Sequence, residues 1–205
     1  MSGDPYPEKI KKCINSWKEK LPDYEIRLWD ANSFDVNQSV WVKEAFEAKR
    51  YAFCSDYIRC YALYNYGGIH LDSDVEVLKL YDSLLSLPYF MGIESAGFIE
   101  AATMGAEAHH PFLKKMLDYY ENRHFLNKNG EPDLVVMPEV IMSILCDNFK
   151  LKEVNSIKEF DKNPNIICYF PYQFFSPIDT SSKRYVLRTS VDTYSIHHFA
   201  NSWVS

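Results

Sequence analysis

Apolar residues recur with a helical period along the first third of the chain. After Pro7, which suits a first helical turn, they fall on one face of a helix: Ile10, Cys13, Ile14, Trp17, Leu21. Residues 39–49 predict a second helix and residues 51–66 a third, which the Gly67-Gly68 pair ends. The third helix is apolar almost all round, which indicates that it is buried.

Short apolar runs of strand length lie between and after these helices. "YEIRLW" at 24–29 alternates and predicts a strand, "IHL" predicts a strand that ends at Asp72, and "VEVL" continues as an extended segment. Further strands are predicted at "YFMGIE", "FIEAATMGA", "NIICYF" and "TYSIHHFA", and further helices at 111–122 and 138–149. Because helices and strands alternate, the pattern predicts an α/β fold with a mixed, mostly parallel sheet flanked by helices. Ligands of such sheets lie at the carboxyl ends of the strands.

Two aspartates stand at such a strand end. Asp72 and Asp74 flank Ser73 between two apolar runs. A D-x-D pair by itself is a weak signal, and it also suits a turn in which carboxylates accept hydrogen bonds from backbone amides. Two carboxylates this close repel each other unless a positive charge lies nearby. Hard oxygen ligands suit Mg²⁺ or Mn²⁺, so a divalent cation at this strand end is the functional interpretation.

A second charged pair lies in the predicted third helix. Asp56 and Arg59 are three residues apart and therefore share a helix face. An exposed pair of this kind contributes little to stability. The neighbouring residues are apolar, however, and buried charges need a partner or a function.

Composition narrows the class of protein. The chain of 205 residues can form one domain with a real core, and its net charge of −6 argues against nucleic-acid binding. Five cysteines without a C-x-x-C pair indicate free thiols in a reducing compartment. No apolar run is long enough to span a bilayer and the N-terminus is no signal peptide, so we expect a cytoplasmic protein whose membrane contact, if any, is peripheral.

The segment "SDYIRCYALYNYGGIHLDSDVEVL" resembles the S-D-x-x-R…G-G-x-Y-x-D-x-D segment of the DXD-containing glycosyltransferases of family 32. These include capsular-polysaccharide transferases and yeast-type mannosyltransferases, and the segment is also similar to the glucosyltransferase domains of large clostridial toxins. "PEKIKKCINSWKEKLPDYEIRLWDANSF" resembles the opening helix and strand of the family, and "SIHHFANSW" its closing element. The resemblance covers most of the chain and is weakest over 95–185.

The resemblance implies a GT-A-type, Rossmann-like fold over residues 1–205, which binds a UDP- or GDP-sugar through Mn²⁺ or Mg²⁺. It implies a retaining hexose transfer to a glycan acceptor, a capsular or cell-surface polysaccharide. The resemblance implies catalytic roles for four residues: Asp56, Arg59, Asp72 and Asp74. The implied metal ligands are Asp72, Asp74 and His197, of which Asp74 coordinates directly. The implied donor contacts are Asp56, Arg59, His70, Asp72, Ser202 and Trp203.

The chain departs from the family pattern at two places. His70 stands where the family has tyrosine, and the first strand of the family has no counterpart before "MSGDPYPEK". We expect either an N-terminally shortened domain or another segment in the place of that strand. Neighbouring residues of a strand point to opposite sides, so only one of His197 and His198 can face the metal; the family position favours His197. Glu94, Glu100, His109 and His110 are candidates for the acceptor side.

Two other functions compete with the transferase. A shortened, non-catalytic domain that binds nucleotide-sugars within a glycan-assembly system would keep the same residues. A haloacid-dehalogenase-like phosphatase also carries D-x-D after a strand, but there the motif ends the first strand, whereas here it comes after about 70 residues.

Overall fold

The computed structural model describes residues 6–179 and 186–200. Its helices are α1 (Glu8–Lys20), α2 (Val40–Glu47), α3 (Tyr51–Tyr66), α4 (Pro111–Tyr120) and α5 (Met137–Asn148). Its strands are β1 (Gly68–Leu71), β2 (Val75–Val77), β3 (Tyr89–Ile93), β4 (Ile99–Ala106), β5 (Lys150–Glu153), β6 (Ile166–Tyr169), β7 (Ile178–Asp179), β8 (Val186–Leu187) and β9 (Ser195–His197). Three short 3-10 helices lie at Val36–Gln38, Asp82–Ser86 and Ile157–Glu159. Within the described residues, no helix is both long and apolar enough to cross a membrane.

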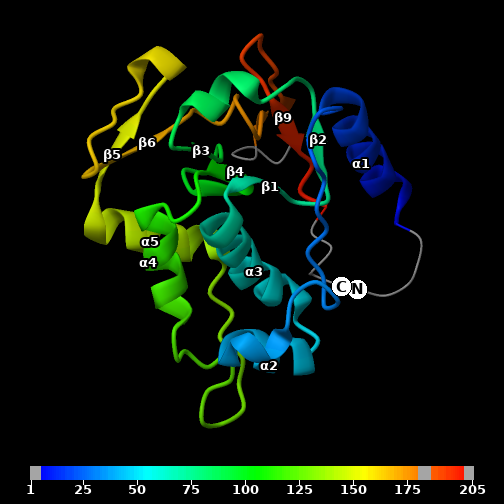
Figure 1. Ribbon diagram of the computed structural model, residues 1–205, viewed down its shortest axis with the longest axis vertical. Coiled ribbons are helices and arrows are strands. Elements are labelled where there is room, and N and C mark those ends of the chain that lie inside the picture. Colours follow the sequence, from blue (N-terminus) through cyan, green and yellow to red (C-terminus); the bar gives the residue numbers. More distant parts are fainter. Residues whose placement is uncertain (1–5, 180–185, 201–205) are drawn as a thin grey trace.

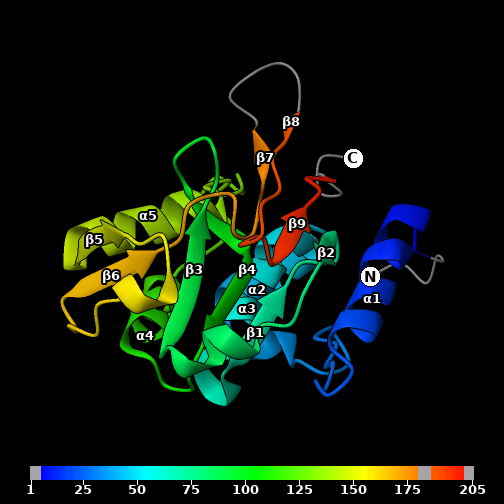
Figure 2. The same ribbon diagram turned by 90° about the horizontal axis from the view of Figure 1, so that it is seen from above.

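The central sheet has the strand order β1-β4-β3, and both pairs of neighbours are antiparallel (Figure 2). Beyond β3, Phe170 forms a parallel bridge to Gly92, and β5 pairs with β6 in parallel. The prediction of a mostly parallel sheet is therefore wrong, although the α/β class holds. The physical reason is the short connection between β3 and β4, because only antiparallel neighbours can be joined by so few residues.

Helices cover one face of this sheet. In Figure 1, α3, α4 and α5 lie together below the strands. Alternate residues of β3 point to opposite sides of the sheet. Tyr89 and Met91 pack in the apolar cluster between the sheet and the helices, whereas Phe90 packs in the aromatic cluster on the other face. The two clusters hold β4 and β1 from both sides and so fix the position of the strand end at Asp72.

Helix α3 ends where the sequence predicts. Gly67 adopts a φ of 66°, and a Cβ on it would lie 2.8 Å from the backbone nitrogen of Ala108. Only glycine meets both conditions without strain. The chain then turns directly into β1, and the residue after this strand, Asp72, lies beside Arg59 of α3.

The predicted strand at 24–29 is not a strand in the structure. Its backbone pairs with no described strand, and its alternating residues Ile26 and Leu28 are exposed. A strand needs a neighbour to satisfy its backbone groups. The outer edge of β1 is likewise unpaired among the described residues, because β4 is its only neighbour there.

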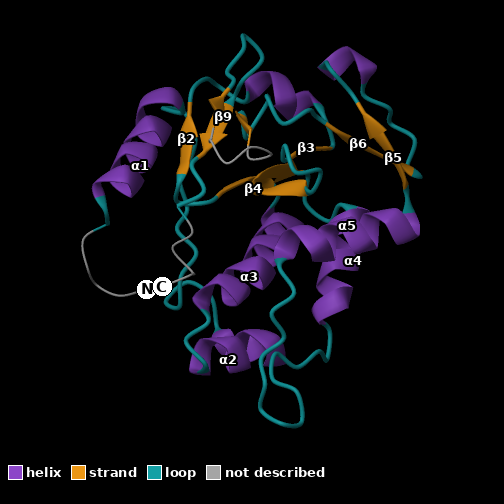
Figure 3. Cartoon of the chain, turned by 180° about the vertical axis from the view of Figure 1, so that it is seen from behind, coloured by secondary structure: helices purple, strands orange, loops and turns teal. Residues whose placement is uncertain are grey.

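A two-stranded antiparallel ribbon of β2 and β9 joins the middle of the chain to its end, with α1 lying against it (Figures 1 and 3). The indole Nε1 of Trp17 in α1 donates to the carbonyl of Val75, 2.6 Å away, and the amide of Val77 donates to the hydroxyl of Ser16. The register places Val75 opposite His197. This pairing brings residues more than 120 positions apart to one place.

Candidate active site

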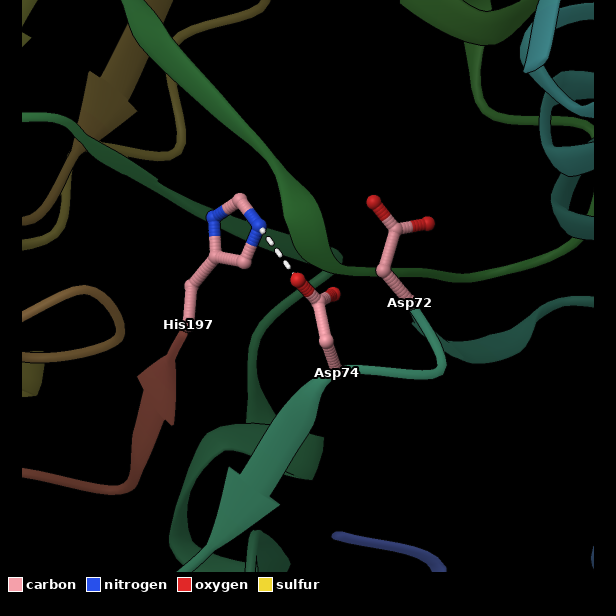
Figure 4. A group of neighbouring side chains, drawn as sticks. All are labelled: Asp72, Asp74 and His197. Carbon is pink, nitrogen blue, oxygen red and sulfur yellow. Dashed lines mark ion pairs between the residues drawn. The ribbon is translucent and has the colours of Figure 1, made fainter. Parts of the chain in front are cut away.

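Three secondary-structure elements place the predicted metal ligands (Figure 4). Asp72 follows β1, and its amide still bonds to the carbonyl of Ala102 in β4 at 2.8 Å. In the turn that follows, the amide of Val75 donates to the carbonyl of Asp72 at 3.0 Å, and Asp74 lies directly before β2. His197 is the last residue of β9. The strand end and the ribbon therefore bring together the three residues that the sequence assigns to the metal.

The donor atoms of this group can surround one cation. One ligand atom from each of Asp72, Asp74 and His197 lies within 4.8 Å of the others. Oδ2 of Asp74 is 3.6 Å from Nε2 of His197 and accepts the amide of Ala200 at 2.7 Å. Within the described residues, Oδ2 of Asp72 and Oδ1 of Asp74 accept no hydrogen bond. Two free carboxylate oxygens beside an imidazole are a donor set that fits Mn²⁺ or Mg²⁺.

Arg59 holds the first aspartate from the side of α3. Its guanidinium lies 3.2 Å from Asp72 and 3.3 Å from Asp56, and it donates to the carbonyl of Ala101 at 2.6 Å. Arg59 and Asp56 are 7% and 9% exposed, which confirms that this helix buries its charged pair. Although burial opposes ionisation, Arg59 and His70 hold the pKa of Asp72 well below its usual range. Burial raises the pKa of Asp56 to about 6 against the opposing charge of Arg59.

His70 contacts the same aspartate. Its Nε2 lies 2.9 Å from Oδ1 of Asp72. Burial and the charge of Arg59 lower the pKa of His70, so the ring is neutral at neutral pH. A carboxylate only accepts, so Nε2 carries the proton and donates it. At the position where the family has tyrosine, this chain thus keeps a hydrogen-bond donor, which it directs at Asp72.

His197, the last residue of β9, and His198, which follows it, have different partners. His197 faces Asp74, whereas Nε2 of His198 lies 2.8 Å from Glu76, which also pairs with Lys12. The alternation of side chains along a strand separates the two rings. The geometry therefore brings His197, and not His198, to the aspartates.

Two glutamates, Glu94 and Glu100, also lie close to His197. Glu100 of β4 is fully buried, and Glu94 lies close enough that ligand atoms of Glu94, Glu100 and His197 fall within 4.8 Å of one another. Burial and the charge of Glu100 raise the pKa of Glu94 to about 7. Burial alone would lower the pKa of His197, but Glu100 and Asp74 raise it to about 11. Sequence reasoning missed the contact of Glu100 with His197, although a single charge within the apolar run of β4 is a signal of a buried, partnered group.

The remaining predicted residues lie elsewhere. His109 and His110 follow β4 beyond Ala106, which pairs with Gly68 at the opposite end of β1 from Asp72. The His110 ring packs against Tyr89 and Phe112. Ser202 and Trp203 lie outside the described residues, and their role stays a prediction.

Comparison with known families finds a match over part of the chain. Residues 7–91 match the family described as "Glycosyltransferase sugar-binding region containing DXD motif". This region contains α1, α3, β1 and β2, and with them Asp56, Arg59, Asp72 and Asp74. His197 lies outside it.

Named relatives are similar over about half of this chain. Inositol phosphoceramide mannosyltransferase 3 of Schizosaccharomyces pombe is 33% identical over 115 residues, which cover 54% of this chain and 32% of the yeast protein. Lactosylceramide 4-alpha-galactosyltransferase of Mus musculus is 35% identical over 108 residues, 50% of this chain and 29% of the mouse protein. The chain thus spans about a third of the length of the curated relatives it matches.

A solved structure shares the fold. The PaToxG glycosyltransferase superposes with a TM-score of 0.50 at 19% sequence identity, over 70% of this chain and 64% of that one. The fold likeness, the family region and the named relatives together confirm the predicted resemblance to the DXD-containing glycosyltransferases.

Proposed function

We propose that this chain, a DXD-containing glycosyltransferase by its region at residues 7–91, moves a hexose from a nucleotide-diphospho-sugar to a glycan acceptor in a metal-dependent, retaining reaction on a GT-A-type fold. One observation carries the proposal. Asp72 and Asp74 each keep a carboxylate oxygen without a hydrogen-bond partner among the described residues, beside the imidazole of His197.

In this proposal Asp74 and His197 hold the cation directly, and Asp72 holds it directly or through a water. When bound, a divalent cation acts as a Lewis acid on the diphosphate that leaves. Arg59 keeps Asp72 ionised and oriented from behind. Asp56 uses only Oδ1 in its contact with Arg59, so Oδ2 can accept a hydroxyl of the donor sugar.

The residues of the site suit more than one donor, so the experiment uses a panel. The two named relatives transfer mannose and galactose by their names, and the panel therefore contains GDP-mannose, UDP-galactose and UDP-glucose. The assay follows release of the nucleoside diphosphate with Mn²⁺, with and without carbohydrate and glycolipid acceptors.

Asp74→Asn is the test variant and His198→Gln the matched control, because His198 lies next to a proposed ligand but faces Glu76. Loss of a ligand that supplies about 3 kcal/mol of transition-state stabilisation should slow release about 100-fold. The control should stay within about threefold of the wild type, a difference of less than 1 kcal/mol.

The competing function is a non-catalytic domain that binds the nucleotide-sugar. The outer edge of β1, unpaired among the described residues, and the unpaired segment 24–29 favour it, because backbone groups without a partner indicate an incomplete sheet. Metal-dependent binding of one donor without any turnover would favour this second function. Neither binding nor turnover with any donor would contradict both.

A further inference from the structure

We propose that Glu100 is a positioning residue that orients His197 for the metal. The proposal rests on the function proposed above, and it concerns a residue outside the matched family region. Both carboxylate oxygens of Glu100 face Nδ1 of His197, Oε1 at 3.2 Å and Oε2 at 3.3 Å. Glu100 is 0% exposed, so this contact is made away from water.

The contact determines which nitrogen of His197 is available. An ionised carboxylate can only accept, so Nδ1 carries a proton and donates it to Glu100. A histidine that binds a cation must be neutral, and with Nδ1 protonated the lone pair of that neutral ring is on Nε2, which faces Asp74. Their separation of 3.6 Å is too long for a hydrogen bond. Glu100 thus directs the basic nitrogen to the place where the free carboxylate oxygens converge.

Glu100 is itself fixed by the strand that supports the aspartates. The amide of Ala102 donates to Oε1 of Glu100 at 2.7 Å, while the carbonyl of Ala102 accepts the amide of Asp72 at 2.8 Å. Between them, the carbonyl of Ala101 accepts Arg59. Glu100 and Ala102 of β4 therefore contact two predicted ligands, His197 and Asp72, and Ala101 between them holds Arg59.

A buried carboxylate needs such a purpose. Glu100 lies between the apolar residues Ile99 and Ala101, and a charge buried without a partner is strongly unfavourable. A carboxylate that accepts the second N–H of a metal-binding histidine fixes the ring and strengthens the ligand, and losing it typically weakens metal binding about 10- to 100-fold.

The test measures Mn²⁺ binding rather than activity. Free Mn²⁺ is followed by electron paramagnetic resonance in titrations of the full chain, for wild type, Glu100→Gln and Glu100→Ala. Glu76→Gln is the matched control, because Glu76 and His198 form a second carboxylate–histidine pair in the same ribbon. We expect one Mn²⁺ per chain, a dissociation constant raised about 10-fold by the glutamine and more by the alanine, and little change in the control.

A double-mutant cycle with His197→Ala shows whether Glu100 acts through the histidine. If it does, Glu100→Gln weakens Mn²⁺ binding in the wild type and has no further effect once His197 is gone. A structural role alone would give the same effect in both backgrounds. Thermal unfolding in EDTA checks that each variant folds, and the isosteric glutamine keeps the test valid if the alanine does not.

Three results would overturn the inference. Unchanged Mn²⁺ affinity in Glu100→Gln would remove the positioning role, while loss of binding in Asp74→Asn would leave the proposed function intact. Two Mn²⁺ per chain, with one lost in Glu94→Gln, would make Glu100 a ligand of a second metal. No Mn²⁺ binding by the wild type would contradict the metal-dependent function itself.

Discussion

Removing Arg59 should destabilise the protein strongly. Arg59→Met keeps the length of the side chain but leaves Asp56 and Asp72 as buried or half-buried carboxylates without their shared cation. Breaking a buried ion pair by removing one partner costs about 3–5 kcal/mol. For a domain of this size each kcal/mol lowers the melting temperature by about 2–4 °C, so we expect a fall of roughly 6–20 °C.

The assay is thermal unfolding by circular dichroism at pH 7 in EDTA, so that bound metal does not mask the effect. Lys114→Met is the matched control, because Lys114 forms an exposed helical pair with Asp118 and its loss should leave the melting temperature almost unchanged. The double variant Asp56→Asn/Arg59→Met should recover part of the loss, since it removes one stranded carboxylate. A fall no larger than that of the control, or a double variant no more stable than Arg59→Met, would refute the reasoning.

Two further predictions concern β3 and β4. The pKa of Glu94 is raised from 4.5 to about 7, so the contribution of Glu94 to stability is complete below pH 4.5 and is lost as the pH rises through 7. In thermal melts in EDTA, Glu94→Gln should therefore match the wild type near pH 4.5 and unfold at a higher temperature above pH 7. Melting temperatures of the two proteins that run parallel over this pH range would contradict the assignment. A Cβ on Gly105 would lie 2.1 Å from the buried ring of Phe90, so Gly105→Ala should destabilise by about 1–3 kcal/mol in urea unfolding, and Phe90→Leu should relieve the clash; additive losses in the double variant would argue against it.

The sequence predicted the helices and the strand end well because local patterns encode them. The glycine pair at 67–68 and the apolar surroundings of Asp56 and Arg59 indicated where α3 ends and that it is buried, and both were confirmed. Strand direction is not encoded in that way. The alternation of apolar residues is the same in parallel and antiparallel strands, and only the short connection at 94–98 indicated a hairpin.

Contacts between distant segments were beyond the sequence. The run at 24–29 has the composition of a strand, but whether it pairs depends on a neighbour that no local pattern reveals. The resemblance to the family favoured His197 over His198, but the geometric reason, the register of β2 and β9, became visible only with the fold. The contact of Glu100 with His197 joins residues 97 positions apart and became visible only with the fold.

The most direct test of the central claim is the position of a bound Mn²⁺. Crystals of the full chain grown with Mn²⁺ and a nucleoside diphosphate, measured at the manganese absorption edge, locate the ion by its anomalous signal. We predict one peak in coordination distance of Asp74 and of Nε2 of His197, with Asp72 in contact directly or through one water. A bound nucleotide with no such peak, or a peak away from these residues, would contradict the account.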